Sequence, residues 1–477
     1  MAELVEPGTY WFARFLFYRG LFLTYFLAFL VAYRQFIPLA GENGLLPFTE
    51  ILDQTSFSNH PTLLHFFPSD KTIHCFSIIG LILSTVGFFG IEWLGSFAVA
   101  GVLLVLWGMY LSLVHGGRLF YGYGWESFLC ETGFLAVFLG GAYTTTPVMM
   151  TFLMAWLLFR IMFGAGLIKI RGDQCWRDLT CMEYHYETQP MPNPFSWLAH
   201  HLPRWWHKFE TFVNHVVELA VPFLYFAPQP ISGVAGAITI GFQGWLMVTG
   251  NFSWLNFLTG ILAIGLLPDS FFFGIEAYLQ PDHLSALSLY HELLIWAYTG
   301  LVIILSYAPT MNLLSKSQAM NASFEPFKLV NTYGAFGSIT KSRYELVVQG
   351  RHQDGPWKTY EFKGKPTDPE RRPPQWAPYH LRLDWQMWFA AMRSRPRLWL
   401  VKMAKKLLEN DEGISSLLRN NPFREVDPPD QVRILRYIYE YTSYDEFRDG
   451  GRWWNRRQVG ETLPAMDKNR INSYLGR

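Results

Sequence analysis

The chain has 477 residues, of which 50% are hydrophobic and 16% are charged. A soluble protein of this size usually carries about 25% charged residues, so the composition excludes an ordinary water-soluble protein. The charges are also unevenly divided, because residues 1–309 hold 11 Lys and Arg against 19 Asp and Glu, whereas residues 310–477 hold 28 against 19. This asymmetry predicts two unlike parts that meet near residue 310.

The first part contains apolar runs long enough to cross a membrane, which takes roughly 17–25 mostly apolar residues. The first run, 11–31, lacks the basic leader and cleavage site of a secretory signal, so it predicts a permanent helix. The later runs lie at 72–93, 96–114, 128–143, 148–170, 212–226, 233–249, 255–267 and 290–307. We therefore expect a polytopic α-helical membrane protein with about eight or nine membrane helices, surrounded by membrane lipids.

A polar segment interrupts the apolar runs at residues 171–208. It is too long for a tight turn and too rich in Trp, Tyr, His and Pro for a simple linker. We interpret it as a polar loop or re-entrant segment inside a multi-helix transmembrane domain that covers residues 1–309.

The pattern beyond residue 309 is that of a water-soluble domain. Alternating apolar and polar residues predict strands, and amphipathic stretches predict helices. The strands are expected at 344–349, 357–362 and 431–441, and the helices at 382–392 and 396–408. The fold class is therefore a helical membrane domain followed by a soluble α+β domain at 310–477.

Two basic residues, Arg160 and Lys169, belong to the apolar run at 148–170. A charged group inside a span is costly and usually faces the protein interior or a water-filled cavity. Glu126 and Glu131, at the start of the preceding run, are candidate partners for Arg160. Lys169 either reaches the membrane interface and forms a structural ion pair, or is a desolvated lysine that acts as a base.

The cysteines and histidines of the polar segment allow several interpretations. Cys175 and Cys181 can form a disulfide if the chain turns back between them, but not if the stretch is helical. The five histidines between residues 185 and 215 have no metal-ligand spacing, so we expect no metal. The sequence also lacks a P-loop, a dinucleotide fingerprint and a G-x-S-x-G elbow, and we expect no cofactor and no nucleic-acid partner.

Four segments together resemble the lipase maturation factor family. The longest is GAGLIKIRGDQCWRDLTCMEYHYETQPMPNP at 164–194, and WESFLCETGFL at 125–135 and GENGLLP at 41–47 precede it. The fourth is YEFKGKPTDPERRPPQWAPYHLRLDWQMWFAA at 360–391. These segments are spread over most of the chain and are long enough to be specific.

The resemblance implies a chaperone-like maturation factor and not an enzyme with a known substrate. Members of the family are endoplasmic-reticulum membrane proteins whose C-terminal domain faces the lumen, where they help secreted dimeric lipases such as lipoprotein lipase to fold. We expect the same membrane for a eukaryotic chain and the inner membrane for a bacterial one. The expected client is a secreted lipase.

The candidate binding residues follow from this hypothesis and from the buried charges. Arg160, Glu126 and Glu131 belong to the membrane domain. The client-binding candidates of the polar segment are Trp176, Arg177, Asp178, His185 and Tyr186, and those of the soluble domain are Arg382, Asp384 and Trp385.

A shorter resemblance supports a different hypothesis. AGLIKIRGDQCW at 165–176 is similar to the segment of vitamin K-dependent γ-carboxylases and their bacterial relatives that holds a lysine base. Lys169 falls on that lysine. The alternative is therefore a membrane enzyme in which Lys169 is the catalytic base and the ligand is hydrophobic or quinone-like.

Overall fold

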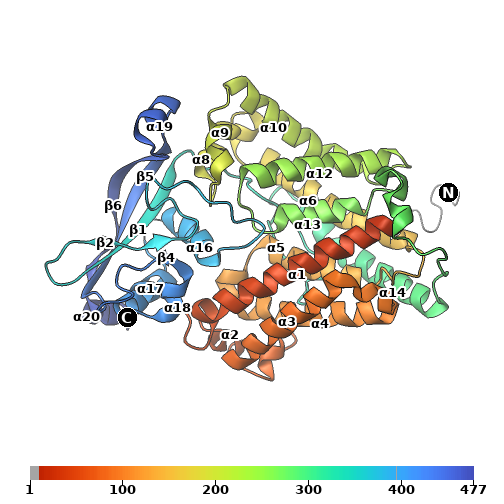
Figure 1. Cartoon of the computed structure of the whole chain (residues 1–477), viewed down its shortest axis with the longest axis horizontal. Coiled ribbons are helices and arrows are strands. Elements are labelled where there is room, and N and C mark those ends of the chain that lie inside the picture. The colour runs from red at the N-terminus through yellow and green to blue at the C-terminus, as the bar shows by residue number, and fades with distance from the viewer. Residues whose placement is uncertain (1–9, 394, 477) are drawn as a thin grey trace.

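The computed structural model describes residues 10–393 and 395–476. It consists of a bundle of helices with a sheet-containing domain at one end, and the C-terminal helix lies beside the sheet (Figure 1). We call the bundle end that faces the sheet domain the proximal end and the opposite end the distal end. Helix α1 (Trp11–Ala40) begins at the distal end and runs to the proximal end (Figure 1).

Six helical stretches of the described chain are long and apolar enough to span a membrane, which confirms the predicted class of fold. At about 1.5 Å per residue, the 30 residues of α1 measure about 45 Å, more than the roughly 30 Å of hydrocarbon. The spans are Trp11–Ala40, Asp70–Leu94, Ser96–Gly116, Val148–Arg171, Ile231–Thr249 and Leu289–Leu314.

The expected eight or nine membrane helices included three runs that form shorter or amphipathic helices. The run at 128–143 becomes α5 (Gly124–Ala136), in which almost every residue is buried. The run at 255–267 becomes the ten-residue α13 (Leu255–Ile264), about half a membrane in length. The run at 212–226 is divided between the end of α10 (Arg204–Leu219), whose first turns are polar, and the short helix α11 (Val221–Leu224). Apolar composition alone did not separate these three helices from true spans.

The remaining helices of the membrane half follow in chain order. Helices α3 (Asp70–Gly90), α4 (Ser96–Gly116), α6 (Val148–Arg171), α12 (Ile231–Thr249) and the pair α14 (Leu289–Leu305) and α15 (Tyr307–Leu314) form the other spans. The polar segment at 171–208 folds into α7 (Gln174–Arg177), α8 (Met182–Thr188) and α9 (Pro194–His200) at the proximal end. The other short helices are α2 (Thr49–Leu52) and α11 (Val221–Leu224).

Helix α1 is the centre of the bundle and packs closely on α3. Phe22 and Phe29 of α1 are fully buried, and each lies over a glycine of α3. A Cβ atom on Gly80 would lie 2.3 Å from the Phe29 ring, and one on Gly87 would lie 2.2 Å from the Phe22 ring. These small residues, two helical turns apart, let the two helices approach each other.

The sheet domain has an antiparallel sheet in the order β2-β1-β5-β6. Its strands are β1 (Arg343–Arg351), β2 (Lys358–Thr359), β5 (Gln431–Tyr441) and β6 (Trp454–Met466), and the short strands β3 (Glu361–Phe362) and β4 (Leu418–Asn420) form a second pair. Helices α16 (Arg382–Ala391) and α17 (Leu398–Leu408) pack against β1 and β5. The domain is completed by α18 (Glu412–Leu417), α19 (Tyr444–Gly450) and α20 (Lys468–Leu475).

The predicted strands and helices of this domain were partly right. The run at 357–362 is split between two sheets, and β6, the longest strand, was missed. Residues 315–342, between α15 and β1, return along the membrane half, where Asn331 and Tyr333 contact α5. The domain limits at residues 309 and 310 stay a prediction.

Candidate functional site

A buried ion pair joins the membrane half to the sheet domain. Arg382 of α16 donates a hydrogen bond from Nη1 to Oε1 of Glu126 in α5 at 2.7 Å, and both side chains are fully buried. The guanidinium lies 3.4 Å from the ring centre of Tyr121, and Tyr110 donates a second hydrogen bond to Glu126. Removing one partner of such a pair leaves an uncompensated buried charge.

Of the two predicted partners of Arg160, Glu131 is confirmed and Glu126 is wrong, because Glu126 pairs with Arg382. Arg160 pairs instead with Glu131, one helical turn further along α5. Glu131 also accepts hydrogen bonds from the Tyr333 hydroxyl at 2.7 Å and from the Asn331 side chain at 2.9 Å. The pairing of Glu126 with Arg382 could not be predicted from the sequence, because the two residues are 256 positions apart in the chain.

Aromatic rings surround the ion pair at the junction. Trp385 of α16 packs edge-on against Trp125 with 4.8 Å between ring centres, and Trp125 stacks on Tyr123 at 4.6 Å. The neighbouring Asp384 accepts a hydrogen bond from the Gly364 backbone N–H at 2.6 Å. Burial raises the pKa of Asp384 to about 6. The predicted residues Arg382, Asp384 and Trp385 are thus buried between the domains.

Lys169 forms a buried ion pair close to the proximal end of α6. Its Nζ lies 2.6 Å from Oε1 of Glu218 and donates a hydrogen bond to Asn214 Oδ1 at 2.9 Å. The same Nζ lies 5.0 Å from the centre of the Trp176 ring. The structure therefore places Lys169 in an ion pair, the first of its two interpretations.

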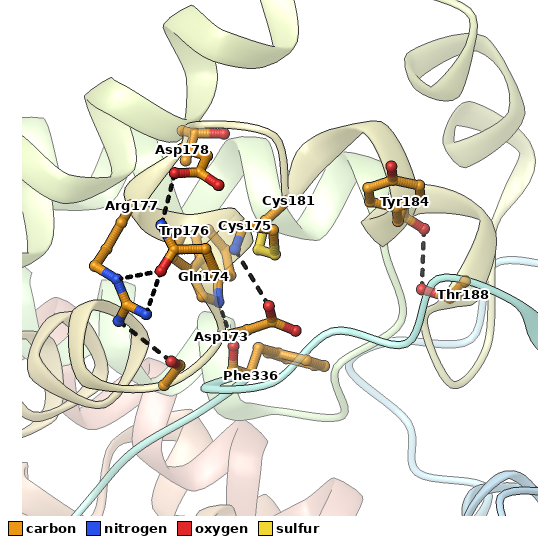
Figure 2. Close-up of a disulfide and its surroundings, with 12 residues drawn as sticks. Asp173, Gln174, Cys175, Trp176, Arg177, Asp178, Cys181, Tyr184, Thr188 and Phe336 are labelled. Atoms are coloured by element: carbon orange, nitrogen blue, oxygen red, sulfur yellow. Dashed lines mark hydrogen bonds between the residues drawn. A yellow bond between two sulfur atoms is a disulfide. The ribbon is translucent and has the colours of Figure 1, made fainter.

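The polar segment turns back on itself through a disulfide between Cys175 and Cys181 (Figure 2). Asp173 accepts a hydrogen bond from the Cys175 N–H and so begins α7, and Leu179 in the return turn has a φ of 58°. The chain between the two cysteines is a short turn and not a continuous helix. The Cα atoms of the two cysteines are therefore only 4.8 Å apart, within the range that a disulfide spans.

The predicted residues of this segment point in different directions. Trp176 is buried and donates a hydrogen bond from Nε1 to the Phe336 carbonyl at 2.9 Å (Figure 2). Arg177 and Asp178 are exposed and both bind the Gln174 side chain. The structure separates these two residues from the buried group.

His185 and Tyr186 of α8 are buried, and Tyr186 belongs to the same apolar cluster as the two bonded cysteines. Burial, with a smaller contribution from the charge of Lys169, lowers the pKa of His185 to about 3, so the imidazole is neutral at physiological pH. The Tyr186 hydroxyl donates a hydrogen bond to Glu210 of α10 at 2.6 Å. The described residues contain no group of three or more His, Cys, Asp or Glu arranged to hold a metal ion.

A cavity of about 1100 Å³ lies between α6, α10 and α12 of the membrane half and α16 of the sheet domain. It is larger than the roughly 300–1,000 Å³ of typical small-molecule sites. Four predicted residues line it: Lys169, Trp176, His185 and Trp385. The sequence analysis missed its other polar lining residues, notably Asn214, Glu218, Gln243 and Asn256. The signal available in the sequence was the spacing of Asn214 and Glu218, which lie four residues apart in a mostly apolar run and therefore on one face of a helix.

Comparisons with known proteins cover both domains. The family model described as the lipase maturation factor transmembrane domain matches residues 12–273, and that of the lipase maturation factor C-terminal domain matches residues 329–464. The chain is 40% identical to lipase maturation factor 1 of Homo sapiens, over 99% of this chain and 90% of that protein. It is 39% identical to lipase maturation factor 1 of Bos taurus, over 99% of this chain and 92% of that protein.

A second group of relatives is more distant. The chain is 28% identical to lipase maturation factor 2 of Rattus norvegicus, over 94% of this chain and 82% of that protein. No solved structure matches the chain.

Proposed function

The chain belongs to the lipase maturation factor family, and we propose that it is a membrane-embedded, chaperone-like factor that assists the folding and assembly of a secreted lipase. The observation that carries this proposal is similarity over 99% of the chain to proteins named as lipase maturation factors. The match includes both domains, so both are expected to take part.

The junction supports different roles for the two domains: the membrane half anchors the protein, and the sheet domain contacts the client. The buried Glu126–Arg382 pair fixes α16 to the membrane half, so the sheet domain is held at the membrane surface. A client that emerges from the membrane would meet this domain directly. We propose that the sheet domain and the exposed turn at Arg177 and Asp178 are the client-binding surfaces.

The disulfide supports a location in the endoplasmic-reticulum membrane with the sheet domain in the lumen. Disulfides persist in oxidising compartments and are rare in the cytosol. The Cys175–Cys181 bond lies at the proximal end of the bundle, and Glu187 of the adjoining α8 accepts a hydrogen bond from the Tyr441 N–H of β5 at 2.7 Å. The sheet domain and the disulfide are therefore expected on the same side of the membrane.

No observation favours the carboxylase-like alternative. Lys169 is held by Glu218 and Asn214, and the relatives reported above are named as maturation factors.

Co-expression with a secreted dimeric lipase tests the proposed function. In cells that lack their own maturation factor, the full chain is expected to raise the activity per mass of secreted lipase, while leaving an unrelated secreted protein unchanged. Lipase that is equally active with and without the chain would contradict the proposal. Lys169→Met combined with Glu218→Met removes both charges of the pair, and this variant should retain the effect.

A further inference from the structure

The cavity at the junction extends into the membrane half and reaches its outer surface. Phe209 of α10 and Ile238 and Trp245 of α12 line the cavity and are 51%, 42% and 38% exposed. Helices α10 and α12 lie side by side along one flank of the bundle (Figure 1). Because α12 is one of the membrane-spanning helices, the opening between α10 and α12 faces the bilayer. A membrane lipid can therefore enter the cavity without crossing water.

The two acidic residues that line the cavity differ in how the protein holds them. Glu218 is paired with Lys169. Glu210 accepts hydrogen bonds from the Tyr186 hydroxyl at 2.6 Å and from Trp245 Nε1 at 2.8 Å. Its Oε2 atom is buried without a hydrogen-bond partner among the described residues and lies 3.7 Å from His207 Nδ1, so Glu218 is paired with a lysine and Glu210 is not.

The basic lining residues are in excess. Besides Lys169, the lining includes Arg171, Lys316 and Arg397. Burial and the neighbouring charge of Arg393 lower the pKa of Arg397, as expected where cations gather without an acid. Arg171 belongs to the proximal end of α6, and Arg397 directly precedes α17 of the sheet domain, so both lie on the side of the cavity that faces the sheet domain.

The inner walls are largely apolar, and Asn256 contributes one of the unpartnered polar groups of the described lining. Ile161 and Met162 of α6, Val217 of α10 and Leu255 of α13 line this part. Asn256 is 4% exposed, and its Oδ1 has no hydrogen-bond partner among the described residues. A buried acceptor of this kind costs free energy unless a ligand or water donates to it.

We propose that this cavity binds an anionic lipid taken from the bilayer. Its hydrocarbon chain lies between α6, α10 and α12, and its carboxylate or phosphate head group lies against Arg171, Lys316 and Arg397. The apolar walls fit the chain, the basic excess fits the head group, and the lateral opening supplies the route. Two sources share this chemistry: a free fatty acid and an acidic phospholipid.

Photo-crosslinking of the full chain in phosphatidylcholine nanodiscs tests the proposal. The probes are a diazirine-bearing fatty acid and a phosphatidic acid with a diazirine in one acyl chain, and the labelled peptides are identified by mass spectrometry. We expect labelling of lining residues such as Ile161 and Phe242. Unlabelled oleate or phosphatidate should reduce it, and the more effective competitor identifies the source. Labelling that is confined to lipid-facing residues outside the cavity, or reduced equally by phosphatidylcholine, would overturn the proposal.

Two glycines of α12 provide a matched pair of variants. Gly241 lines the cavity, and a Cβ atom there would have no neighbour within 4 Å, so the side chain of Gly241→Phe begins in open space at the cavity wall. Gly244 has the same free space, lies one turn further along the helix and is not a lining residue. Gly241→Phe should reduce competable labelling by about fivefold or more, while Gly244→Phe should leave it unchanged. Equal labelling in both variants would contradict the assignment.

The exposed Lys316 gives a test that leaves the core of the fold untouched. Replacing one Lys that contacts an acidic head group is expected to weaken binding about fivefold, and Lys316→Glu by more. Lys341→Glu, a change of the same charge on the same connecting segment outside the cavity lining, is the control. If Lys316→Glu and Lys341→Glu label alike, the head group does not lie at Lys316.

Discussion

At the scale of single residues, the structure is organised by buried charges that find partners far away in the sequence. Glu126 and Arg382 meet across the domain junction, and Glu131 and Arg160 meet inside the membrane half. Lys169 and Glu218 form a third pair beside the cavity. Because each side chain is almost fully buried, the loss of one partner should cost more than the pair itself contributes.

Arg382→Met should destabilise the protein strongly because Glu126 is left charged and buried. Breaking a buried pair costs roughly 3–5 kcal/mol. The measurement is thermal unfolding of the detergent-solubilised protein. Arg382→Met combined with Glu126→Gln should recover much of the loss, whereas Arg448→Ala, in an exposed pair with Asp445, should have little effect. If the double variant is as unstable as Arg382→Met alone, the unpaired charge of Glu126 is not the cause of the lost stability.

At the scale of helices and strands, the sequence predicted the spans well and the short elements poorly. The runs at 96–114 and 148–170 form α4 and α6 almost unchanged, because long apolar runs have few alternatives. The apolar end of the amphipathic α10 and the half-length α13 have compositions that resemble those of membrane spans. Strand β6 is largely exposed on both faces over residues 455–461, so it lacks the alternation by which strands are recognised.

The same limit applies to the site. The polar segment at 171–208 could be identified from composition, and its candidates Trp176 and His185 line the cavity, as does Lys169 of the preceding apolar run. The cavity itself could not be predicted, since it arises where α6, α10, α12 and the sheet domain meet in space. Asn256 is an example, because nothing in its apolar surroundings in the sequence indicates an unpaired acceptor in a cavity wall.

The contact between α1 and α3 should depend on its glycines. Gly80→Ala places a Cβ 2.3 Å from the Phe29 ring and forces the helices apart. Overpacking of this kind costs roughly 1–3 kcal/mol. Gly101→Ala in α4, where nothing lies within 4 Å, is the control and should be neutral or slightly stabilising. Equal unfolding temperatures for Gly80→Ala and the wild type would show that α1 and α3 are not packed as described.

At the scale of the whole molecule, the buried histidines around the junction couple stability to pH. Burial lowers the pKa of His185 to about 3 and of His200 to about 4, and it lowers the pKa of His380 well below 6.5. Between pH 7.5 and 6 the unfolded chain therefore takes up protons that the folded chain does not. The sign is a loss of stability as the pH falls. Asp384, whose pKa burial raises to about 6, opposes this in part because its folded form takes up a proton.

The expected net effect is about 1–2 kcal/mol lower stability at pH 6 than at pH 7.5. Unfolding temperatures at the two pH values measure it. Replacement of His200 by Phe should reduce the difference. A protein that is more stable at pH 6 would mean that the histidines are protonated in the folded state.

The central claim is that the sheet domain stands on the lumenal side of the membrane, where a secreted lipase folds. Cys75→Ser and Cys130→Ala leave only the disulfide-bonded cysteines, so single new thiols can be labelled. Asn420→Cys lies on the exposed strand β4 of the sheet domain, and Asp282→Cys lies in the exposed connection before α14 at the distal end.

The decisive measurement is labelling of these two variants by a membrane-impermeant thiol reagent in sealed microsomes. We predict that Asp282→Cys is labelled in intact microsomes, and that Asn420→Cys is labelled only after the membrane is opened. The reverse pattern would place the sheet domain in the cytosol, where it could not meet a secreted lipase, and would contradict the proposed function.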